Sequence, residues 1–570
     1  MKRTGAQIVW EMLQREGVKV VFGIPGGAIM HTYHPLKEYD IHHVLVRHEQ
    51  CAAHAADGYA RASEQVGVAI ATSGPGATNL VTGIATAMMD SSPIVCITGQ
   101  VPTTVIGSDA FQETDIMGIT LPITKHNYLV TDVNDLAGVI HEAFYIARSG
   151  RPGPVLIDLP KDVQQATTDF APPEGAPKLP GYHPAGAGDP EAVKRAAALI
   201  NQAERPVVLA GHGVLMSGAI AVLRSFAEKT GTPVTSTLLG QGGVDASHPL
   251  SLGMMGMHGE AVANQAIQEA DLLLALGMRF SDRVTGRLTH YAPKARKIHV
   301  DLDAAELNKI VPADVPIQGD LRQVLEQIMP LVRPAEHRTW RTQIACWQAE
   351  ARTRDVVNRP EPGHLLTPVV IDTIWKETNG EAIVVTDVGQ HQMWTAQYYH
   401  LKHPPLITPG GLGTMGFGLP AAIGAQVALP DKEVWVIVGD GGFQMTLEEL
   451  ATVVQENLPL RIALCNNSYL GMVRQWQELF YDRRYESTHL VNPDFVQLAK
   501  AYGIRSWRAR DDAESHQAIA EAHRHPGPTL IEFRTAQTGE EGNVYPIVPA
   551  GAALHEMIRR PSPGDEIYSR

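Results

Sequence analysis

Apolar and polar positions along this chain alternate between two kinds of segment. Short, fully apolar runs are typical of buried strands, and apolar residues spaced three and four positions apart between them are typical of amphipathic helices. Strands that alternate with helices predict a parallel sheet covered by helices on both faces. In the first block, residues 1–170, the apolar runs predict strands at 18–23, 43–46, 67–72, 93–98 and 153–160.

Two further blocks repeat this pattern. Residues 171–190 are rich in Pro and Gly and predict a linker, and 359–364 predict a second one. The second block, 190–345, has apolar runs at 205–211, 233–239, 271–277 and 297–303; the third, 365–550, has them at 380–390, 433–438, 460–465 and 527–535. The predicted fold class is therefore α/β, with three doubly wound parallel-sheet domains. We expect the polar residues 551–570 to form a mobile tail.

Composition and charge narrow the range of partners. A formal net charge of −14 argues against nucleic acid, because there is no basic surplus to meet phosphates. No apolar run approaches the ~18 residues of a membrane span, and the N-terminal segment lacks the apolar core of a signal peptide. The four cysteines are scattered in apolar settings without a CxxC pair. We therefore expect no disulfide framework and a reducing, cytoplasmic location.

The strongest chemical signal lies between residues 439 and 467. Gly439-Asp440-Gly441 follows one predicted strand, an amphipathic helix spans 447–457, and Asn466-Asn467 follow the next strand. Such a unit makes its strands parallel, so Asp440 and Asn467 leave the same carboxyl edge of one sheet. Oxygen ligands and a glycine-rich turn suit Mg²⁺ that carries a diphosphate. The spacing resembles the diphosphate motif of thiamine-diphosphate (ThDP) enzymes; a plain βαβ unit with polar strand ends is the alternative.

Glu49 is the candidate catalytic acid. It follows a predicted strand and begins a helix. ThDP chemistry needs a carboxyl group against N1′ of the aminopyrimidine, where it favours the imino tautomer whose nitrogen removes the C2 proton. Taken alone, a glutamate at the start of a helix more often stabilises the helix N-terminus electrostatically. Beside the diphosphate motif, catalysis is favoured. A zinc HExxH site is excluded because position 52 is Ala52.

The glycine run at 411–416 can be interpreted in two ways. Gly411, Gly413 and Gly416 match the dinucleotide fingerprint GxGxxG, which would make the protein a nicotinamide-dependent dehydrogenase. That fingerprint needs an acid at the end of the next strand, whereas Asp431 and Glu433 precede it. In a ThDP enzyme, the Gly413 backbone would contact the aminopyrimidine. Met415 would be the apolar wedge that bends the cofactor, although taken alone it would be a core methionine.

Long stretches resemble the FAD-containing catalytic subunit of acetohydroxyacid synthase (acetolactate synthase). They include FGIPGGAI, RHEQCAAHAADGYARA, GSDAFQE, RFSDRVTG, GQHQMW and GMVRQWQELFY, in order along nearly the whole chain. The resemblance implies that the first domain holds the aminopyrimidine, the third holds the diphosphate, and the middle one is of the FAD-binding type. In this family the cofactor lies between two subunits. The implied partners are therefore a second copy, as homodimer or tetramer, and a separately encoded small regulatory subunit.

The resemblance also assigns roles to residues. Gly26 and Gln112 join Glu49 around the reacting groups. Arg283 would pair with a substrate carboxylate through its planar fork of donors, and Trp476 would sort the second substrate by size. Substrate contacts are expected from Phe111, Met257, Arg283, Val473 and Trp476, and ThDP contacts from Gly413, Met415, Gly439, Asp440, Gly441, Gly442, Asn467 and Met472. The Mg²⁺ ligands would be the side chains of Asp440 and Asn467 and the backbone carbonyl of Tyr469.

FAD is expected to be structural, since the implied net reaction is not a redox reaction. Its contacts are expected from Arg151, Gly211, Gly213, Thr237, Leu238, His258, Gly277, Arg279, Asp301 and Asp320. Ser281 departs from the family pattern, which usually has a second acid there.

The implied reaction is the decarboxylation of pyruvate on ThDP and transfer of the hydroxyethyl group to pyruvate or 2-oxobutyrate. The products are 2-acetolactate and 2-aceto-2-hydroxybutyrate, the first common step of valine, leucine and isoleucine synthesis. Three alternatives stay open: a FAD-independent fermentative acetolactate synthase, another ThDP enzyme such as pyruvate oxidase or a 2-oxo acid decarboxylase, and the nicotinamide-dependent dehydrogenase.

Overall fold

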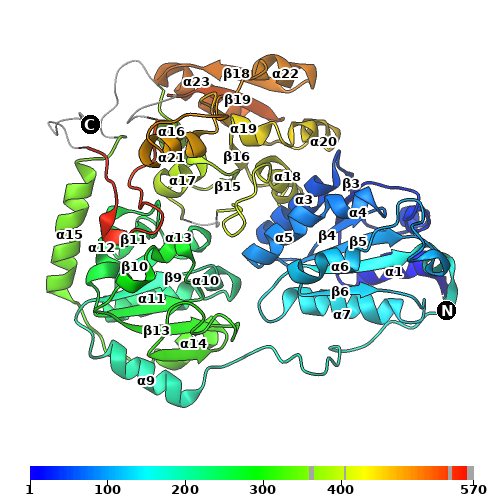
Figure 1. Cartoon of the computed structure of the whole chain (residues 1–570), viewed down its shortest axis with the longest axis horizontal. Coiled ribbons are helices and arrows are strands. Elements are labelled where there is room, and N and C mark those ends of the chain that lie inside the picture. The colour runs from blue at the N-terminus through cyan, green and yellow to red at the C-terminus, as the bar shows by residue number, and fades with distance from the viewer. Residues whose placement is uncertain (358–364, 403–405, 537–541, 562–570) are drawn as a thin grey trace.

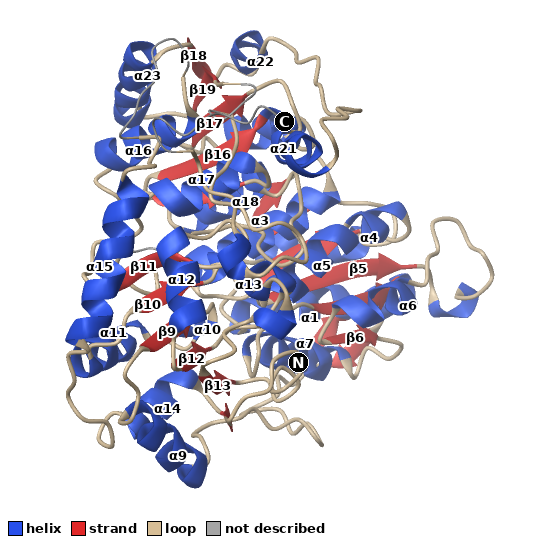
Figure 2. Cartoon of the chain, turned by 60° about the vertical axis from the view of Figure 1, so that its left-hand side comes forward, coloured by secondary structure: helices blue, strands red, loops and turns tan. Residues whose placement is uncertain are grey.

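A computed structural model describes residues 1–357, 365–402, 406–536 and 542–561. These residues form three α/β domains, as predicted, each built on its own parallel sheet (Figures 1 and 2). The predicted linker at 359–364 lies outside the described residues. The linker at 171–190 connects β8 (Thr167–Asp169) to α9 (Pro190–Ile200). Among the described residues, no helix is both long and apolar enough to cross a membrane.

Domain I carries a six-stranded sheet in the order β3-β2-β4-β5-β7-β6. Apolar clusters lie on both of its faces, one against α3 (Glu49–Ser63) and α5 (Val81–Asp90), the other against α1 (Gly5–Arg15) and α7 (Leu136–Arg148). The strands are β2 (Val20–Gly23), β3 (His42–Leu45), β4 (Gly67–Ala71), β5 (Ile94–Gln100), β6 (His126–Leu129) and β7 (Val155–Pro160). A short antiparallel pair, β1 (Lys2–Thr4) with β8, joins the two ends of the domain.

Domain II has six parallel strands in the order β11-β10-β9-β12-β13-β14. Numbered along the chain, this is the order 3-2-1-4-5-6, which reverses between β9 and β12. The strands are β9 (Pro206–Ala210), β10 (Val234–Ser236), β11 (Ser251–Met254), β12 (Leu272–Leu276), β13 (Arg296–Asp301) and β14 (Val315–Gln318). Helices α9, α11 (Ile220–Thr230) and α14 (Leu321–Ile328) cover one face, and α12 (Ala261–Glu269) and α15 (Arg338–Arg352) the other.

Domain III has the order β15-β16-β17-β19-β18. The strands are β15 (Ile383–Thr386), β16 (Val434–Gly439), β17 (Arg461–Asn466), β18 (Arg505–Ala509) and β19 (Thr529–Arg534). Its helices are α16 (Thr367–Glu377), α17 (Gln390–Tyr398), α18 (Gly418–Ala428), α19 (Asp440–Phe443), α20 (Leu450–Gln455), α21 (Gly471–Phe480), α22 (Phe495–Ala501) and α23 (Asp512–Arg524). The helix predicted at 447–457 begins as the 3₁₀ turn η6 (Leu447–Glu449) and continues as α20.

Three details differ from the sequence analysis. Leu554 and Met557 are buried in the apolar core of domain II, so 551–561 is not a free tail. The reason is that this segment still carries apolar side chains spaced to reach α12. Helix α15 runs past the boundary expected at 345. Cys346 is exposed on that helix rather than set among apolar residues; all four cysteines are free.

Domains I and III meet where α3 packs on α18. A Cβ on Gly58 would lie 2.0 Å from the carbonyl oxygen of Ala421, and one on Gly424 would lie 1.9 Å from that of Ala55. Because the two backbones approach this closely, both positions require glycine. The contact between α3 and α18 therefore fixes the distance between domains I and III.

This packing makes a stability prediction. Gly58→Ala inserts a methyl group against a backbone oxygen that cannot move aside, and overpacking of this kind costs about 1–3 kcal/mol. We expect a lower melting temperature in scanning calorimetry. The matched control is Gly138→Ala in α7, where a Cβ meets nothing within 4 Å. That variant should melt at or slightly above wild type, because alanine is the better helix former. A Gly58→Ala protein as stable as Gly138→Ala would contradict the prediction.

Candidate active site

The predicted metal ligands lie at one edge of the domain III sheet. Gly439 pairs with Cys465 across β16 and β17, so Asp440 and Asn467 leave the sheet side by side. Asp440 is 1% exposed, and burial raises its pKa to about 6. The amide of Asn492 donates to Asp440 Oδ2 (2.6 Å) and to Asn466 Oδ1 (3.0 Å), which ties the two strand ends together. A cation at this edge would hold the buried carboxylate in its ionised form.

The third predicted ligand sits on the turn after β17. Asn467 Oδ1 accepts the backbone N–H of Tyr469 (3.0 Å). Tyr469 and His489 face each other in an isolated antiparallel bridge. The two backbone hydrogen bonds of this bridge run from the N–H of Leu470 to the carbonyl of Thr488 and from the N–H of Leu490 to the carbonyl of Ser468. The carbonyl of Tyr469 takes no part in this pairing. The donor set is thus oxygen only, which fits Mg²⁺.

The glycine-rich turns around this edge are close-packed. A Cβ on Gly442 would lie 2.2 Å from Asp387 Oδ1, and one on Gly441 would lie 2.7 Å from Leu470 Cδ2 and 3.6 Å from Met415 Cε. A Cβ on Gly439 would lie 3.0 Å from the ring of His391. The structure therefore brings Met415, the predicted wedge, to the predicted diphosphate turn. Gly413 has φ +71°, and a Cβ there would meet nothing within 4 Å, so its backbone is open to a ligand.

Glu49, Gly26 and Gln112 gather around one turn of domain I. Glu49 is the half-buried first residue of α3, and its Oε1 lies 3.4 Å from the Cβ position of Gly76. Gly26 follows β2, and its Cβ position is 2.5 Å from Cβ of Thr72. Gln112, at φ +59°, lies against Gly74. Because β2 and β4 flank the point where this sheet changes direction, these residues occupy its ligand-binding edge.

Three of the predicted substrate residues meet between domains II and III. The Arg283 guanidinium lies 5.5 Å from the ring centre of Trp476, and its Nη1 donates to Met257 Sδ (3.2 Å). A cavity of about 150 Å³ is lined by two of them, Met257 and Arg283, and by Val548–Gly551. Val473 is half-exposed nearby in α21, whereas Met472 packs on the domain III core. Phe111 is not part of this group: it is 88% exposed on domain I.

The predicted FAD residues line the carboxyl edge of the domain II sheet. Gly211 follows β9 and Gly277 follows β12, at the reversal of strand order where folds of this 3-2-1-4-5-6 order bind dinucleotides. Thr237 follows β10, Asp301 ends β13 and Asp320 immediately precedes α14. The three glycines do not face open space. Cβ atoms on Gly211 and Gly213 would meet the backbone of Gly277 at 2.2 and 2.7 Å, so they let two strand ends touch.

Charged residues at this edge are partly engaged already. Arg151, from domain I, pairs with Asp303 (3.3 Å) and Glu306 (3.1 Å). Burial raises the pKa of Asp301 to about 6 and lowers that of Arg279. The Asp320 carboxylate caps α14 by accepting the N–H of Gln323 (3.0 Å).

Thr237, Leu238 and His258 differ in their surroundings. Thr237 caps the short turn η4 (Leu238–Gly240) by accepting the N–H of Gly240, and Leu238 packs against domain III. His258 is 9% exposed, and burial lowers its pKa to about 4. Its Nδ1 has no partner among the described residues.

Comparison with known proteins identifies the family of this chain. Three thiamine pyrophosphate enzyme domains match: the N-terminal TPP binding domain at 3–119, the central domain at 193–328 and the C-terminal TPP binding domain at 387–533. The chain is 48% identical to the acetolactate synthase large subunit of Parasynechococcus marenigrum over 98% of this chain and 91% of the relative. It is also 48% identical to that of Corynebacterium glutamicum, over 98% and 90%. A probable acetolactate synthase large subunit of Methanocaldococcus jannaschii is 46% identical over 97% and 95%.

The chain belongs to the acetolactate synthase large subunits. For a member of this family, the glycine run at 411–416 is no dinucleotide fingerprint. It precedes α18, and among the described residues no strand lies between α17 and α18. The carboxylate of Asp90 fixes the beginning of the run by accepting the N–H groups of Gly410 and Gly411 (3.1 and 2.6 Å).

Sequence reasoning missed several residues that surround the predicted cofactor site. Asp387 is buried and accepts N–H groups from Val388, Gly416 and Gly418, so it holds the loop that contains Gly413 and Met415. His391 lies against Gly439, and its buried Nε2 has no partner among the described residues. Such an orphaned polar atom is what a diphosphate oxygen would satisfy. The stretch GQHQMW is part of the family resemblance, but the resemblance assigns no role to its histidine, His391.

Asn79 is a further residue that the sequence did not single out. It ends α4 (Pro75–Asn79), and its amide donates to Glu49 Oε2 (2.9 Å). This leaves Oε1 as the oxygen free to share a proton. Asn79 also ends SGPGATN, a stretch that is common to many ThDP enzymes and so gave no specific signal.

We expect Asn79→Ala to lower kcat by about tenfold or more, because it removes the hydrogen bond that fixes the Glu49 carboxyl group, and displacement of a catalytic group by about 1 Å can cost on the order of a hundredfold in rate. The measurement is steady-state kinetics with pyruvate. The control is Thr78→Ala in the same helix, whose hydroxyl bonds only its own backbone turn at Pro75. Equal kcat values for the two variants would show that Asn79 does not support Glu49.

Proposed function

We propose that the chain joins two 2-oxo acids: it decarboxylates pyruvate and transfers the two-carbon unit to pyruvate or 2-oxobutyrate. The products are 2-acetolactate and 2-aceto-2-hydroxybutyrate. The observation that carries this proposal is the stacking of Arg283 on Trp476 at 5.5 Å. It sets a carboxylate-binding cation beside a flat apolar surface, as a 2-oxo acid with a short alkyl chain requires. A ThDP enzyme that only decarboxylates has no need for such a second acceptor site.

ThDP, when bound, supplies the electron sink that makes decarboxylation and carbon–carbon bond formation accessible. The protein's share is to bind and orient. Asp440, Asn467 and the carbonyl of Tyr469 would hold Mg²⁺, and the backbone at Gly413 with Met415 would fix the aminopyrimidine. Glu49 would share the proton on its Oε1 with the ring nitrogen, while Asn79 occupies Oε2.

Arg283 and Trp476 would select the second substrate. The guanidinium fork binds a carboxylate in two places, and the indole face beside it accepts a methyl or ethyl group. The adjoining cavity, closed on one side by Val548–Gly551, would keep water away from the reacting carbon. Met257 lines this cavity. Val473 would border the substrate, and Phe111 would reach it from a second copy of the chain.

We propose FAD as a structural third cofactor. The strand order of domain II supports a dinucleotide at the β9/β12 reversal, and Asp301 and Arg279 lie at that edge. Overall acetolactate formation consumes no electrons, so no redox role follows. Cytoplasmic location is likewise proposed, as is a small regulatory subunit, because the relatives are named large subunits.

A second copy of the chain would complete the site. Within one chain Glu49 contacts Asn79 and Gly76 of its own domain, Phe111 is 88% exposed, and Gly413 opens to empty space. These residues belong to the two halves of the predicted cofactor site. We therefore propose at least a homodimer whose active sites combine Glu49 of one copy with Asp440 of the other.

Hybrid enzymes test the shared site. Glu49→Gln and Asp440→Asn homodimers should both be inactive. A heterodimer of the two, isolated with different tags, should have about half of wild-type activity, because one of its two symmetry-related sites receives both intact residues. An inactive heterodimer would show instead that each chain builds its site from its own Glu49 and Asp440.

Product analysis tests the reaction itself. We expect purified protein with ThDP and Mg²⁺ to convert pyruvate to 2-acetolactate, with FAD required and no oxygen consumed. The same assay without FAD is the control. Activity without flavin would place the protein with the fermentative enzymes. Acetaldehyde or acetyl phosphate as the product would mean that the carbon–carbon bond-forming role is wrong.

A further inference from the structure

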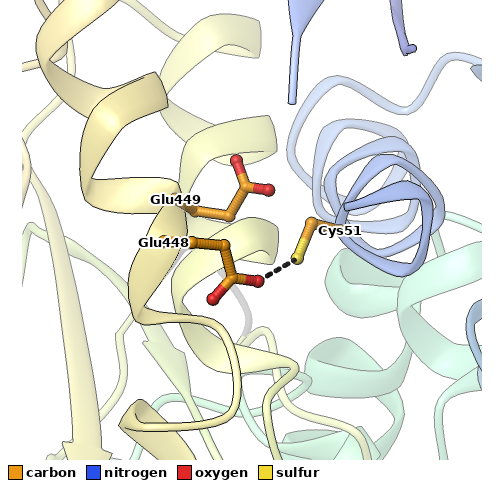
Figure 3. A group of neighbouring side chains, drawn as sticks. All are labelled: Cys51, Glu448 and Glu449. Carbon is orange, nitrogen blue, oxygen red and sulfur yellow. Dashed lines mark hydrogen bonds between the residues drawn. The ribbon is translucent and has the colours of Figure 1, made fainter. Parts of the chain in front are cut away.

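Cys51, Glu448 and Glu449 form a cluster between domains I and III that the proposed reaction does not use (Figure 3). Cys51 lies in α3, and the two glutamates end η6. Their spacing would allow a metal ion, but their surroundings argue against one. Burial raises the pKa of Cys51 well above its usual value, so the thiol keeps its proton. Both oxygens of Glu449 already accept hydrogen bonds.

Glu449 holds the backbone immediately before α3. It is fully buried, and its Oε1 accepts the N–H groups of Arg47 (2.7 Å) and His48 (3.2 Å). Its Oε2 accepts the hydroxyl of Thr452 (2.5 Å), which fixes the carboxylate on its own helix. The next residue along the chain is Glu49. One carboxylate from domain III therefore binds two consecutive backbone N–H groups of domain I, directly before the candidate catalytic residue.

The contacts of its neighbours are different in kind. Glu448 reaches only the Cys51 thiol, at 3.9 Å. Glu456, at the end of α20, pairs with His42 (2.7 Å) across the same domain boundary, on the exposed side. Both help to join the two domains, but among the described residues neither has a hydrogen bond to the segment 47–49. Only Glu449 of these three can set the position of Glu49.

We propose that Glu449 is a positioning residue for Glu49: it fixes the entry of α3 so that the Glu49 carboxyl group reaches the aminopyrimidine ring. This rests on the proposed catalytic role of Glu49. Asn79 holds the carboxyl group from one side and Glu449 holds the backbone from the other, so the side chain has little freedom left. Displacement of a catalytic group by about 1 Å can cost on the order of a hundredfold in rate.

The test uses the full-length enzyme with ThDP, Mg²⁺ and FAD. Two quantities are measured: kcat and KM for pyruvate, and the rate at which the C2 proton of bound ThDP exchanges with deuterium. We expect Glu449→Ala to lower kcat and the exchange rate together, on the order of tenfold to a hundredfold. KM should stay close to wild type, because substrate binding is not disturbed. Glu449→Gln should be nearly normal, since its amide oxygen can still accept both N–H groups.

Matched variants separate positioning from general loosening of the interface. Glu448→Gln and Glu456→Gln should keep both rates. If Glu449→Ala keeps wild-type rates, or if Glu456→Gln loses as much as Glu449→Ala, the positioning role is wrong. Should Glu449→Ala not fold, Glu449→Asp decides: it keeps the charge but shortens the side chain, and normal rates would overturn the proposal.

Failure of the underlying function has a different signature. Glu49→Gln should abolish C2 exchange. If it does not, the catalytic role of Glu49 is wrong, whatever Glu449 does. If Glu49→Gln is inactive while all Glu449 variants are normal, only the positioning role is lost.

Discussion

The close packing of α3 on α18 is the constraint on which the geometry of domains I and III depends. Gly58 and Gly424 bring the two backbones into contact, and no side chain can be added at either position without separating them. Helix α3 begins with Glu49, and the loop that contains Gly413 and Met415 leads into α18. The spacing of the two helices therefore determines how a chain presents both halves of the proposed cofactor site. Arg61 reinforces this contact from within α3: it pairs with Asp57 and Asp90 (both 2.7 Å) and donates to the carbonyl of Thr408 in domain III.

Buried carboxylates act here as anchors for functional loops. Asp90 holds Gly410 and Gly411, Asp387 holds Gly416 and Gly418, and Glu449 holds Arg47 and His48, in each case through backbone N–H groups. A buried charge is tolerable only when it is paired or hydrogen-bonded. The backbone N–H groups of a loop also need acceptors once they are buried. Each anchor meets both needs at once. Glycine-rich loops, which have little side-chain packing of their own, can thereby keep one conformation.

Among the strands of the three parallel sheets, those that the sequence did not predict share one feature. β6, β11, β14 and β18 are all edge strands, with sequences HNYL, SLGM, VPIQ and RSWRA. An edge strand is only partly covered, so it needs no continuous apolar run, and the pattern that identifies central strands is missing. The final segment was misjudged for a related reason. Its polar composition predicted a tail, whereas two apolar residues, Leu554 and Met557, suffice to dock 551–561 on domain II.

The sequence by itself determined the three-domain α/β architecture, the edge at which a metal site is proposed and, through the family resemblance, the residues proposed for catalysis. Those features depend on short-range patterns: apolar runs, a glycine turn after a strand, and paired asparagines one βα unit later. Only the tertiary structure decided which residues support them. It also brought together Arg283 and Trp476, which the resemblance names separately, from different domains. Asn79 is 30 positions from Glu49, and Glu449 is 402 positions from Arg47. No local periodicity encodes such contacts, because they arise from how the packed helices and sheets bring distant turns together.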